Sequence, residues 1–332
     1  MTNLSAFHSP ILFQPFHRPM IWGGRTLETE LKRNLPSAEN YGESWEISDH
    51  PSHLSVVAEG PLQGKTLRDL MRENSKELLG KNSSHSSFPW LVKYLDAHDW
   101  LSVQVHPDEY KVKTLWPGEG PKNEAWLILD AKPTAKIFAG LLPGVTPQQV
   151  RDASIAGTVG ELLHQFTPKK GDCVYLPAGT VHAVGGGVLI AEIQQTSDAT
   201  FRLFDWNRKD SQGKSRQLHL EESMACIDWT SGPVHPVKNN PNESRCTLVK
   251  APYFHLDVLN SDTKQMLSNE GHMQIGMVLE GEGTLTSDSH QIHIKLGDTF
   301  LFPASLTGFL ATSRYTKNTS RNATQLNNHW KD

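Results

Sequence analysis

One eight-residue pattern occurs twice in this chain of 332 residues, and it limits the folds that the chain can adopt. Residues 171–178 read Gly-Asp-Cys-Val-Tyr-Leu-Pro-Ala, and residues 297–304 read Gly-Asp-Thr-Phe-Leu-Phe-Pro-Ala. In each copy the middle residues favour an extended strand, while the glycine before and the proline after favour turns. A repeat of this kind is explained most simply by two similar β domains. We therefore expect a second domain near the C-terminus that resembles the first.

The rest of the chain has the same β character, with two helical exceptions. Runs of strand-forming residues separated by Gly, Pro and Asn occur at 89–95, 101–105, 125–129, 172–176 and 188–193. Residues 66–79 instead place apolar side chains at helical spacing and stop at Gly80. A second helix is predicted from Thr146, a capping residue followed by proline and, three residues on, Gln149. We expect a mainly β protein with helical insertions at about 64–82 and 146–166.

A segment rich in Gly, Pro and Asn, residues 231–244, predicts the boundary between the two domains. This division gives a first domain of residues 1–235 and a second of residues 236–332. From Thr312 onward the chain is polar, and we expect a last strand followed by a loose tail.

Charge and composition exclude several classes of partner. The formal net charge is -4, and no run of Lys and Arg predicts binding to nucleic acid or to a membrane surface. The first 24 residues lack a continuous apolar stretch, so we expect the protein to stay in the cytoplasm. The three cysteines are widely spaced and form no Cys-x-x-Cys pair, which argues against a disulfide framework or a thiolate zinc site. Any metal must therefore be bound by nitrogen and oxygen.

Four such ligands are candidates for one metal ion. Gln104 and His106 are two apart in a predicted strand, so both side chains project from the same face. Glu124 begins the apolar run 125–129, and His182 follows the turn at 177–179. Although most histidines in a β protein are ordinary core or surface residues, His106 and His182 each have a separate reason to point inward. This mixed set suits Zn²⁺, with Fe²⁺ and Mn²⁺ as competitors.

The second copy of the repeat lacks the metal-binding chemistry of the first. Gly308 stands at the position of His182, and Ser305 stands at that of Gly179. We therefore expect the C-terminal domain, residues 236–332, to be structural and to lack metal ligands.

In several separate segments the chain resembles the type I mannose-6-phosphate isomerases, zinc-dependent enzymes of the cupin fold, and most of all their shorter bacterial form. The segments that carry the resemblance are 22–24, 42–48, 101–108, 122–124, 171–182 and 194–208. They occur in the family's order over roughly the first two thirds of the chain. The resemblance implies two cupin (jelly-roll) barrels and one Zn²⁺ per chain, held by Gln104, His106, Glu124 and His182.

The resemblance also implies roles around the metal. Arg202, in the Ser-Asp-x-x-x-Arg segment, is assigned to the active site, and Lys122 matches a family lysine. Lys93 and Ser102 match polar positions of the family's pocket, and Arg208 matches a basic residue that reaches the phosphate. For the catalytic base we consider Lys122, Glu192 and a metal-bound water, and the sequence does not choose among them.

The activity implied is interconversion of mannose 6-phosphate and fructose 6-phosphate through an enediol. The substrate would then be a sugar phosphate, and we expect a monomer or a weak homo-oligomer. Two other functions remain open at the level of sequence. One is a metal-dependent cupin oxygenase, and the other is a non-catalytic sugar-binding cupin, against which the intact set of four ligands argues.

Overall fold

The structure, a computed structural model, describes residues 4–210, 212–260, 265–286, 291–306, 308–314 and 323–327. Strands dominate it and helices are few, which confirms the mainly β prediction. The predicted strands are all present at or within a few residues of their expected positions. Within the described ranges no helix is both long enough and apolar enough to cross a membrane.

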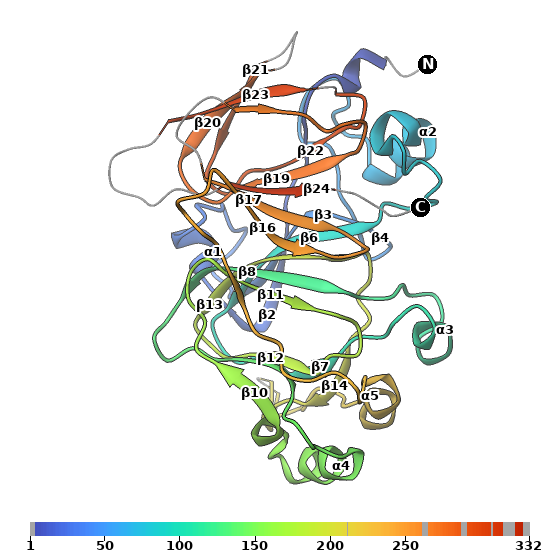
Figure 1. Ribbon diagram of the computed structural model, residues 1–332, viewed down its shortest axis with the longest axis vertical. Helices are drawn as coiled ribbons and strands as arrows, with labels where there is room; N and C mark the ends of the chain where they lie inside the picture. The colour runs from blue at the N-terminus through green and yellow to red at the C-terminus, as the bar shows by residue number, and fades with distance from the viewer. Residues whose placement is uncertain are drawn as a thin grey trace.

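The sheets are stacked along the long axis of the molecule (Figure 1), and two of them form its lower half. The seven-stranded sheet has the order β15 (Val237–Lys238), β11 (Asp172–Leu176), β8 (Glu124–Ala131), β13 (Val188–Gln195), β6 (Trp90–Ala97), β3 (Tyr41–Ile47) and β2 (Phe16–Gly24). The five-stranded sheet below it has the order β10 (Leu163–Phe166), β9 (Ile137–Leu141), β12 (His182–Val184), β7 (Val103–Val105) and β14 (Phe201–Phe204).

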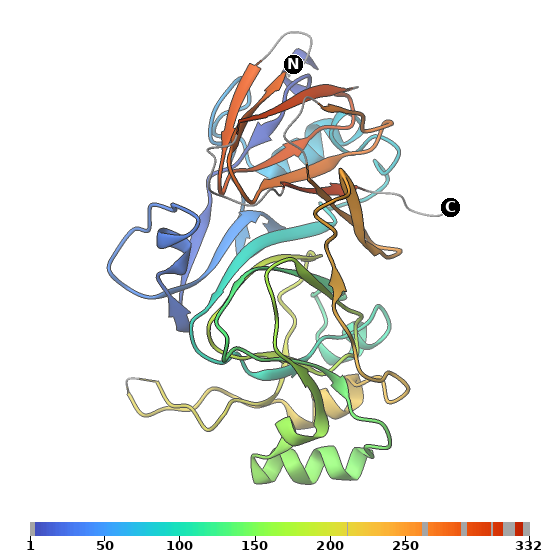
Figure 2. The same cartoon turned by 60° about the vertical axis from the view of Figure 1, so that its left-hand side comes forward.

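Two further sheets form the upper half, in which the C-terminal strands lie (Figure 2). The six-stranded sheet has the order β1 (Ile11–Leu12), β22 (Thr299–Phe302), β19 (Gln274–Val278), β24 (Ala323–Asn327), β17 (His255–Leu259) and β16 (Arg245–Lys250). The four-stranded sheet has the order β18 (Gln265–Leu267), β23 (Phe309–Arg314), β20 (Glu282–Thr286) and β21 (Gln291–Lys295). A short hairpin pairs β4 (Asp49–His50) with β5 (His53–Leu54).

The last strand expected in the polar segment after Thr312 is present as β24, residues 323–327. It pairs with β17 on one side and β19 on the other, and backbone N–H and C=O groups make these bonds whatever the polarity of the side chains. The tail expected after it lies outside the described residues.

The helices are short and lie outside the sheets. They are η1 (Leu4–Phe7), α1 (Thr26–Thr29), α2 (Leu67–Leu79), α3 (Lys111–Leu115), α4 (Pro147–Ala156), η2 (Val159–Leu162) and α5 (Leu220–Cys226). Both helices expected from the sequence are present as α2 and α4, and each begins with a capping box. Pro147 occupies the first turn of α4, as the sequence predicted.

The two copies of the repeat have the same local structure. Gly171 and Gly297 have φ angles of 85° and 88°, in the left-handed region that glycine adopts without strain, and strands β11 and β22 follow them. The predicted linker contributes β15, which pairs with β11 at the edge of the seven-stranded sheet. The division near residue 235 and the description as two barrels remain predictions.

Alternation along three central strands gives the seven-stranded sheet two different faces. Val92 and Tyr94 of β6, Leu127 of β8 and Ile193 of β13 belong to a large apolar core shared with the six-stranded sheet. Because successive side chains of a strand point to opposite faces, the intervening residues Lys93, Glu124 and Glu192 point the other way. Charged side chains thus enter the space toward the five-stranded sheet.

The capping box at the start of α2 can be tested by mutation. Thr66 accepts a hydrogen bond from the Asp69 amide, and the Asp69 carboxylate accepts one from the Thr66 amide. Thr66→Ala should lower the free energy of unfolding by about 1 kcal/mol, because one amide loses its cap. Urea denaturation followed by circular dichroism measures the change. Thr66→Ser keeps the hydroxyl and is the control, so equal losses in both variants would contradict the assignment.

Candidate metal centre and surrounding cavity

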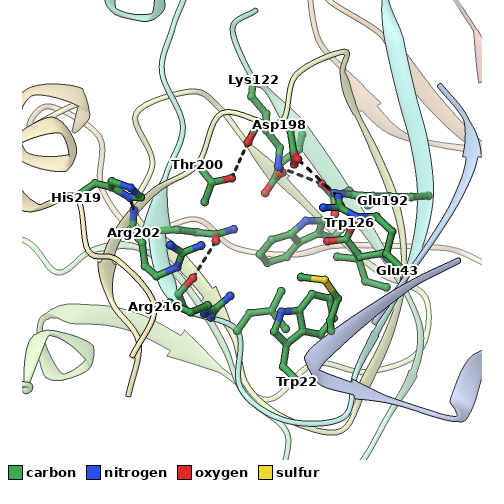
Figure 3. Close-up of a pocket in the computed structure, with 18 of the residues that line it drawn as sticks. Trp22, Glu43, Lys122, Trp126, Glu192, Asp198, Thr200, Arg202, Arg216 and His219 are labelled. Atoms are coloured by element: carbon green, nitrogen blue, oxygen red, sulfur yellow. Dashed lines mark hydrogen bonds and ion pairs between the residues drawn. The ribbon is translucent and has the colours of Figure 1, made fainter. Parts of the chain in front are cut away.

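A polar cavity of about 270 Å³ lies between the seven-stranded and five-stranded sheets. Its volume is just below the usual ~300–1,000 Å³ of small-molecule sites, which suits a small polar ligand. Strands of both sheets line it, and Figure 3 shows how their side chains converge. The described lining residues with polar or aromatic side chains are Arg18, Trp22, Glu43, Lys93, Ser102, Gln104, Trp116, Lys122, Glu124, Trp126, Glu192, Asp198, Thr200, Arg202, Arg216 and His219.

Strand register aligns the predicted site residues. In the five-stranded sheet, Gln104 of β7 lies opposite His182 of β12 on one side and Arg202 of β14 on the other. In the seven-stranded sheet, Lys93 lies opposite Glu192. Segments far apart in the sequence therefore meet in one cavity because of how their strands pair.

Four predicted ligands meet at one place. The ligand atoms of His106, Glu124 and His182 lie within 4.8 Å of one another, and all three residues are buried. Nε2 of His106 is 3.5 Å from Oε2 of Glu124, and Nε2 of His182 is 3.2 Å from Oε1. The side-chain amide of Gln104 lies 3.3 Å from Nε2 of His182.

Hydrogen bonds fix the tautomer of both histidines. Nδ1 of His106 lies 2.8 Å from the Ala199 carbonyl, and Nδ1 of His182 lies 2.9 Å from the Thr180 carbonyl. Since a carbonyl oxygen only accepts, each Nδ1 carries the hydrogen and each Nε2 presents a lone pair to the cluster. This is the arrangement found in metal-binding histidines.

Several buried acceptor atoms of this cluster have no hydrogen-bond donor, and a bound cation would satisfy them. Among the residues that the structure describes, Nε2 of His106 has no hydrogen-bond partner, and neither has either carboxylate oxygen of Glu124, although Nζ of Lys122 is 2.9 Å from Oε2. Unsatisfied buried acceptors are costly. Two imidazole nitrogens and a carboxylate aimed at one point fit a divalent metal ion.

Electrostatics keep this set in the protonation state that binds metals. Burial, and then the charge of Lys122, lowers the pKa of His106 to about 3. Burial also lowers the pKa of His182. Burial alone would raise the pKa of Glu124, but the charges of Lys122, His106 and His182 together outweigh burial and hold that pKa well below its usual range. At neutral pH the cluster is two neutral rings and one carboxylate.

Lys122, Glu192 and Lys93 form a second buried cluster beside the first. Nζ of Lys122 and Nζ of Lys93 are each 3.5 Å from Oε1 of Glu192. Burial raises the pKa of Glu192 to about 8. Burial would lower the pKa of Lys122, but the carboxylates of Glu124 and Glu192 outweigh it and raise that pKa. This cluster can hold and exchange protons near the ligand set.

Of the three predicted substrate-binding residues, Lys93 and Ser102 line the cavity and Arg208 does not. Ser102 donates a hydrogen bond of 3.2 Å to Oε1 of Gln104, and Arg202, predicted for the active site, also lines the wall. Arg208 is not among the described lining residues. Its guanidinium is bound to Asp205 and to the Trp100 carbonyl, and it also lies 3.6 Å from Asp99. These contacts hold the Arg208 side chain outside the cavity, whereas the resemblance had placed it near the phosphate.

Several lining residues were not predicted from the sequence. Arg216 and His219 come from the segment after β14, which matches no motif that we recognised, and Arg18 and Glu43 come from β2 and β3. Glu43 and Asp198 lie inside segments that carry the resemblance, 42–48 and 194–208, but neither was given a role.

Asn123 orients the segment that carries Lys122 and Glu124. Its Oδ1 accepts a 2.9 Å hydrogen bond from the amide of Ala178, in the turn that leads to His182. Its Nδ2 donates a 2.7 Å bond to Gln195, in the strand that carries Glu192. One buried side chain thus links three segments of the site.

Comparisons with known proteins agree with this geometry. Residues 12–126 match the model of the type I phosphomannose isomerase catalytic domain, and residues 244–316 match the mannose-6-phosphate isomerase cupin domain. The mannose-6-phosphate isomerase of Streptococcus mutans is 36% identical over 304 residues, which cover 90% of this chain and 93% of the relative. The enzyme ManA of Bacillus subtilis is 37% identical over 303 residues, which cover 90% of this chain and 95% of the relative.

A solved structure gives the same result. The crystal structure of a mannose 6-phosphate isomerase from Bacillus subtilis matches with a TM-score of 0.85 and 32% identity, covering 96% of this chain and all of the other. The fold and the site define a cupin-type β protein in which a polar cavity adjoins residues that could hold a metal ion. The chain belongs to the type I mannose-6-phosphate isomerase family.

The ligand set makes a direct prediction about metal content. Purified protein should contain about one divalent ion per chain, and Glu124→Gln and His182→Ala should each reduce that content strongly, since each removes a ligand. Elemental analysis measures the ratio. His164→Ala removes a histidine outside the cavity and is the control. Retention of a full equivalent by both ligand variants would contradict the site.

Proposed function

We propose that this chain interconverts D-mannose 6-phosphate and D-fructose 6-phosphate. The observation that carries the proposal is that an imidazole–carboxylate ligand set adjoins a buried lysine–glutamate cluster, with Glu124, Lys122 and Glu192 lining one small cavity. An aldose–ketose isomerase needs both parts, because it must stabilise charge on the sugar oxygens and also move a proton between neighbouring carbons. Membership of the family supports the same reaction.

The proposed metal is Zn²⁺, one per chain, held by Gln104, His106, Glu124 and His182. Mixed nitrogen and oxygen donors suit Zn²⁺, and Fe²⁺ and Mn²⁺ share this preference. Turning the side-chain amide of Gln104 by half a turn exchanges Oε1 and Nε2, which brings its oxygen toward His182. When bound, the ion supplies a Lewis acid that stabilises negative charge on the substrate oxygens.

Proton transfer falls to the buried cluster. In an enediol mechanism a base takes the proton from C2 and a proton is returned at C1. Lys122 is the cluster residue nearest the ligand set, at 2.9 Å from Glu124. A cation bound to Glu124 would offset the carboxylate charge that raises the pKa of Lys122, so that lysine would release its proton more readily. Lys122 is our proposed base, with Glu192 as its partner in proton exchange.

Arg202 is proposed to stabilise negative charge on the substrate. It lines the cavity opposite Gln104 in the sheet, and its guanidinium stays cationic at any pH of interest. Lys93 and Ser102 are proposed to contact the sugar. Location in the cytoplasm and a monomeric or weakly oligomeric state remain predictions.

The activity is tested with and without metal. The purified protein should form fructose 6-phosphate from mannose 6-phosphate, lose this activity on chelation and regain it with Zn²⁺, because the charge on the sugar oxygens would otherwise be unstabilised. A coupled assay measures turnover, and oxygen uptake by protein purified without added metal tests the alternative of an oxygenase. Full turnover in metal-free protein would overturn the proposal, and turnover restored only by Fe²⁺ together with oxygen uptake would favour the oxygenase.

The base is tested by comparing two variants. Lys122→Met should reduce kcat by about 10²–10⁴-fold, the usual contribution of a general base, with bound metal retained. Exchange of the C2 hydrogen with solvent deuterium, followed by NMR, should fall in parallel. Glu192→Gln removes the partner and should reduce both rates less. A larger loss for Glu192→Gln would assign the base to Glu192.

A further inference from the structure

The charges that line the cavity differ between its two ends. In Figure 3, Lys122, Glu192 and Glu43 lie on one side, Arg202, Arg216 and His219 lie on the other, and Trp126 and Trp22 lie between them. On the lysine side each cation has a carboxylate close by. Lys93 and Lys122 face Glu192, and Arg18 is 3.1 Å from Glu43. This end has little uncompensated positive charge before a metal is added.

The arginine end is not balanced in this way. Arg208 and Arg216 share the carboxylate of Asp205, and Arg208 also lies 3.6 Å from the half-exposed carboxylate of Asp99. Arg216 uses Nε and Nη2 for this contact, which leaves Nη1 without a hydrogen bond among the described residues. Of these two carboxylates only that of Asp205 is buried, so this end of the cavity has less compensating negative charge than the lysine end.

Arg202 adds a third cation without a carboxylate partner. No carboxylate in the described part of the chain lies within ion-pair distance of its guanidinium, and its Nε is buried without a hydrogen bond. Burial, and then the charge of Arg216, lowers the pKa of Arg202. Two guanidinium groups that repel each other on one cavity wall leave a place for an anion.

The segment that carries Arg216 is fixed to the strand that carries Arg202. Nη1 of Arg202 donates a 2.9 Å bond to the Gln217 carbonyl, and the amide of His219 donates a 2.8 Å bond to the Arg202 carbonyl. The amide of Arg202 in turn donates to Nδ1 of His219 at 3.2 Å. These bonds fix the positions of the two guanidinium groups relative to each other before any ligand binds.

We propose that Arg216, together with Arg202, binds the phosphate of the substrate, and that Arg208 is a positioning residue that holds Asp205. The inference rests on the proposed function, since it places a sugar phosphate in this cavity. In a hexose 6-phosphate the reacting C1–C2 pair and the phosphate on C6 are at opposite ends of the carbon chain. The arginine end therefore takes the dianion while the metal end takes C1 and C2.

Arg216→Gln tests the proposal on the metal-loaded protein. Loss of a charge-assisted contact should raise KM for mannose 6-phosphate about 10- to 100-fold, with kcat changed far less. The dissociation constant of inorganic phosphate, measured by calorimetry, should rise by a similar factor. Zinc content should stay at one per chain. Arg72→Gln, which alters an exposed arginine on α2, should leave all these values unchanged.

Three results separate this inference from the function on which it rests. No turnover of mannose 6-phosphate by the unaltered protein would refute the proposed function, while phosphate calorimetry still tests Arg216. Phosphate binding that is equally tight in Arg216→Gln and in the unaltered protein would overturn the role of Arg216. If Arg216→Gln fails to fold, Arg216→Lys can be used, because it keeps the charge but loses the planar guanidinium that can donate two parallel hydrogen bonds. Unchanged phosphate affinity in Arg216→Lys would also overturn the role of Arg216.

Discussion

The structure depends on a group of charges buried inside a β protein. Glu124, Glu192, Lys93 and Lys122 are each less than 5% exposed, between sheets whose other surfaces are apolar. Isolated buried charges would cost several kcal/mol each, so they persist only because they face one another and, with the histidines, a common point that suits a cation. The same arrangement that makes burial tolerable also brings a ligand set and a proton-exchanging pair together.

The sheets supply the rigidity that this arrangement needs. One face of the seven-stranded sheet packs on a core that extends into the six-stranded sheet, and the other presents the charged residues. A one-residue slip of β6 or β13 would move Lys93 or Glu192 into the apolar core, so burial itself enforces the register. Asn123 adds a polar link between the loop of Lys122 and two other segments. Placing the site on paired strands keeps its geometry fixed.

Sequence reasoning predicted the parts of the site that depend on local pattern. The spacing of Gln104 and His106 and the turn before His182 each predict a direction for a side chain, and the structure brings all of these side chains together. The capped starts of α2 and α4 depend on contacts between residues three apart, so they too were predictable. Prediction failed where partners are distant. Arg208, expected to line the pocket, is held by Asp205 and Trp100, and Arg216 reaches the cavity from a loop that matches no motif.

By itself the sequence determined the β class of the chain, the strands and the helix ends, and which side chains are chemically able to bind a metal or exchange a proton. These properties follow from backbone preference and side-chain type, which act within a few residues. Only the tertiary structure decided that His182, Gln104 and Arg202 stand in one row, that Glu124 meets both histidines, and which arginines face the cavity. Those facts depend on the pairing of strands far apart in the chain and on the competition of several arginines for one carboxylate, and no local pattern encodes either.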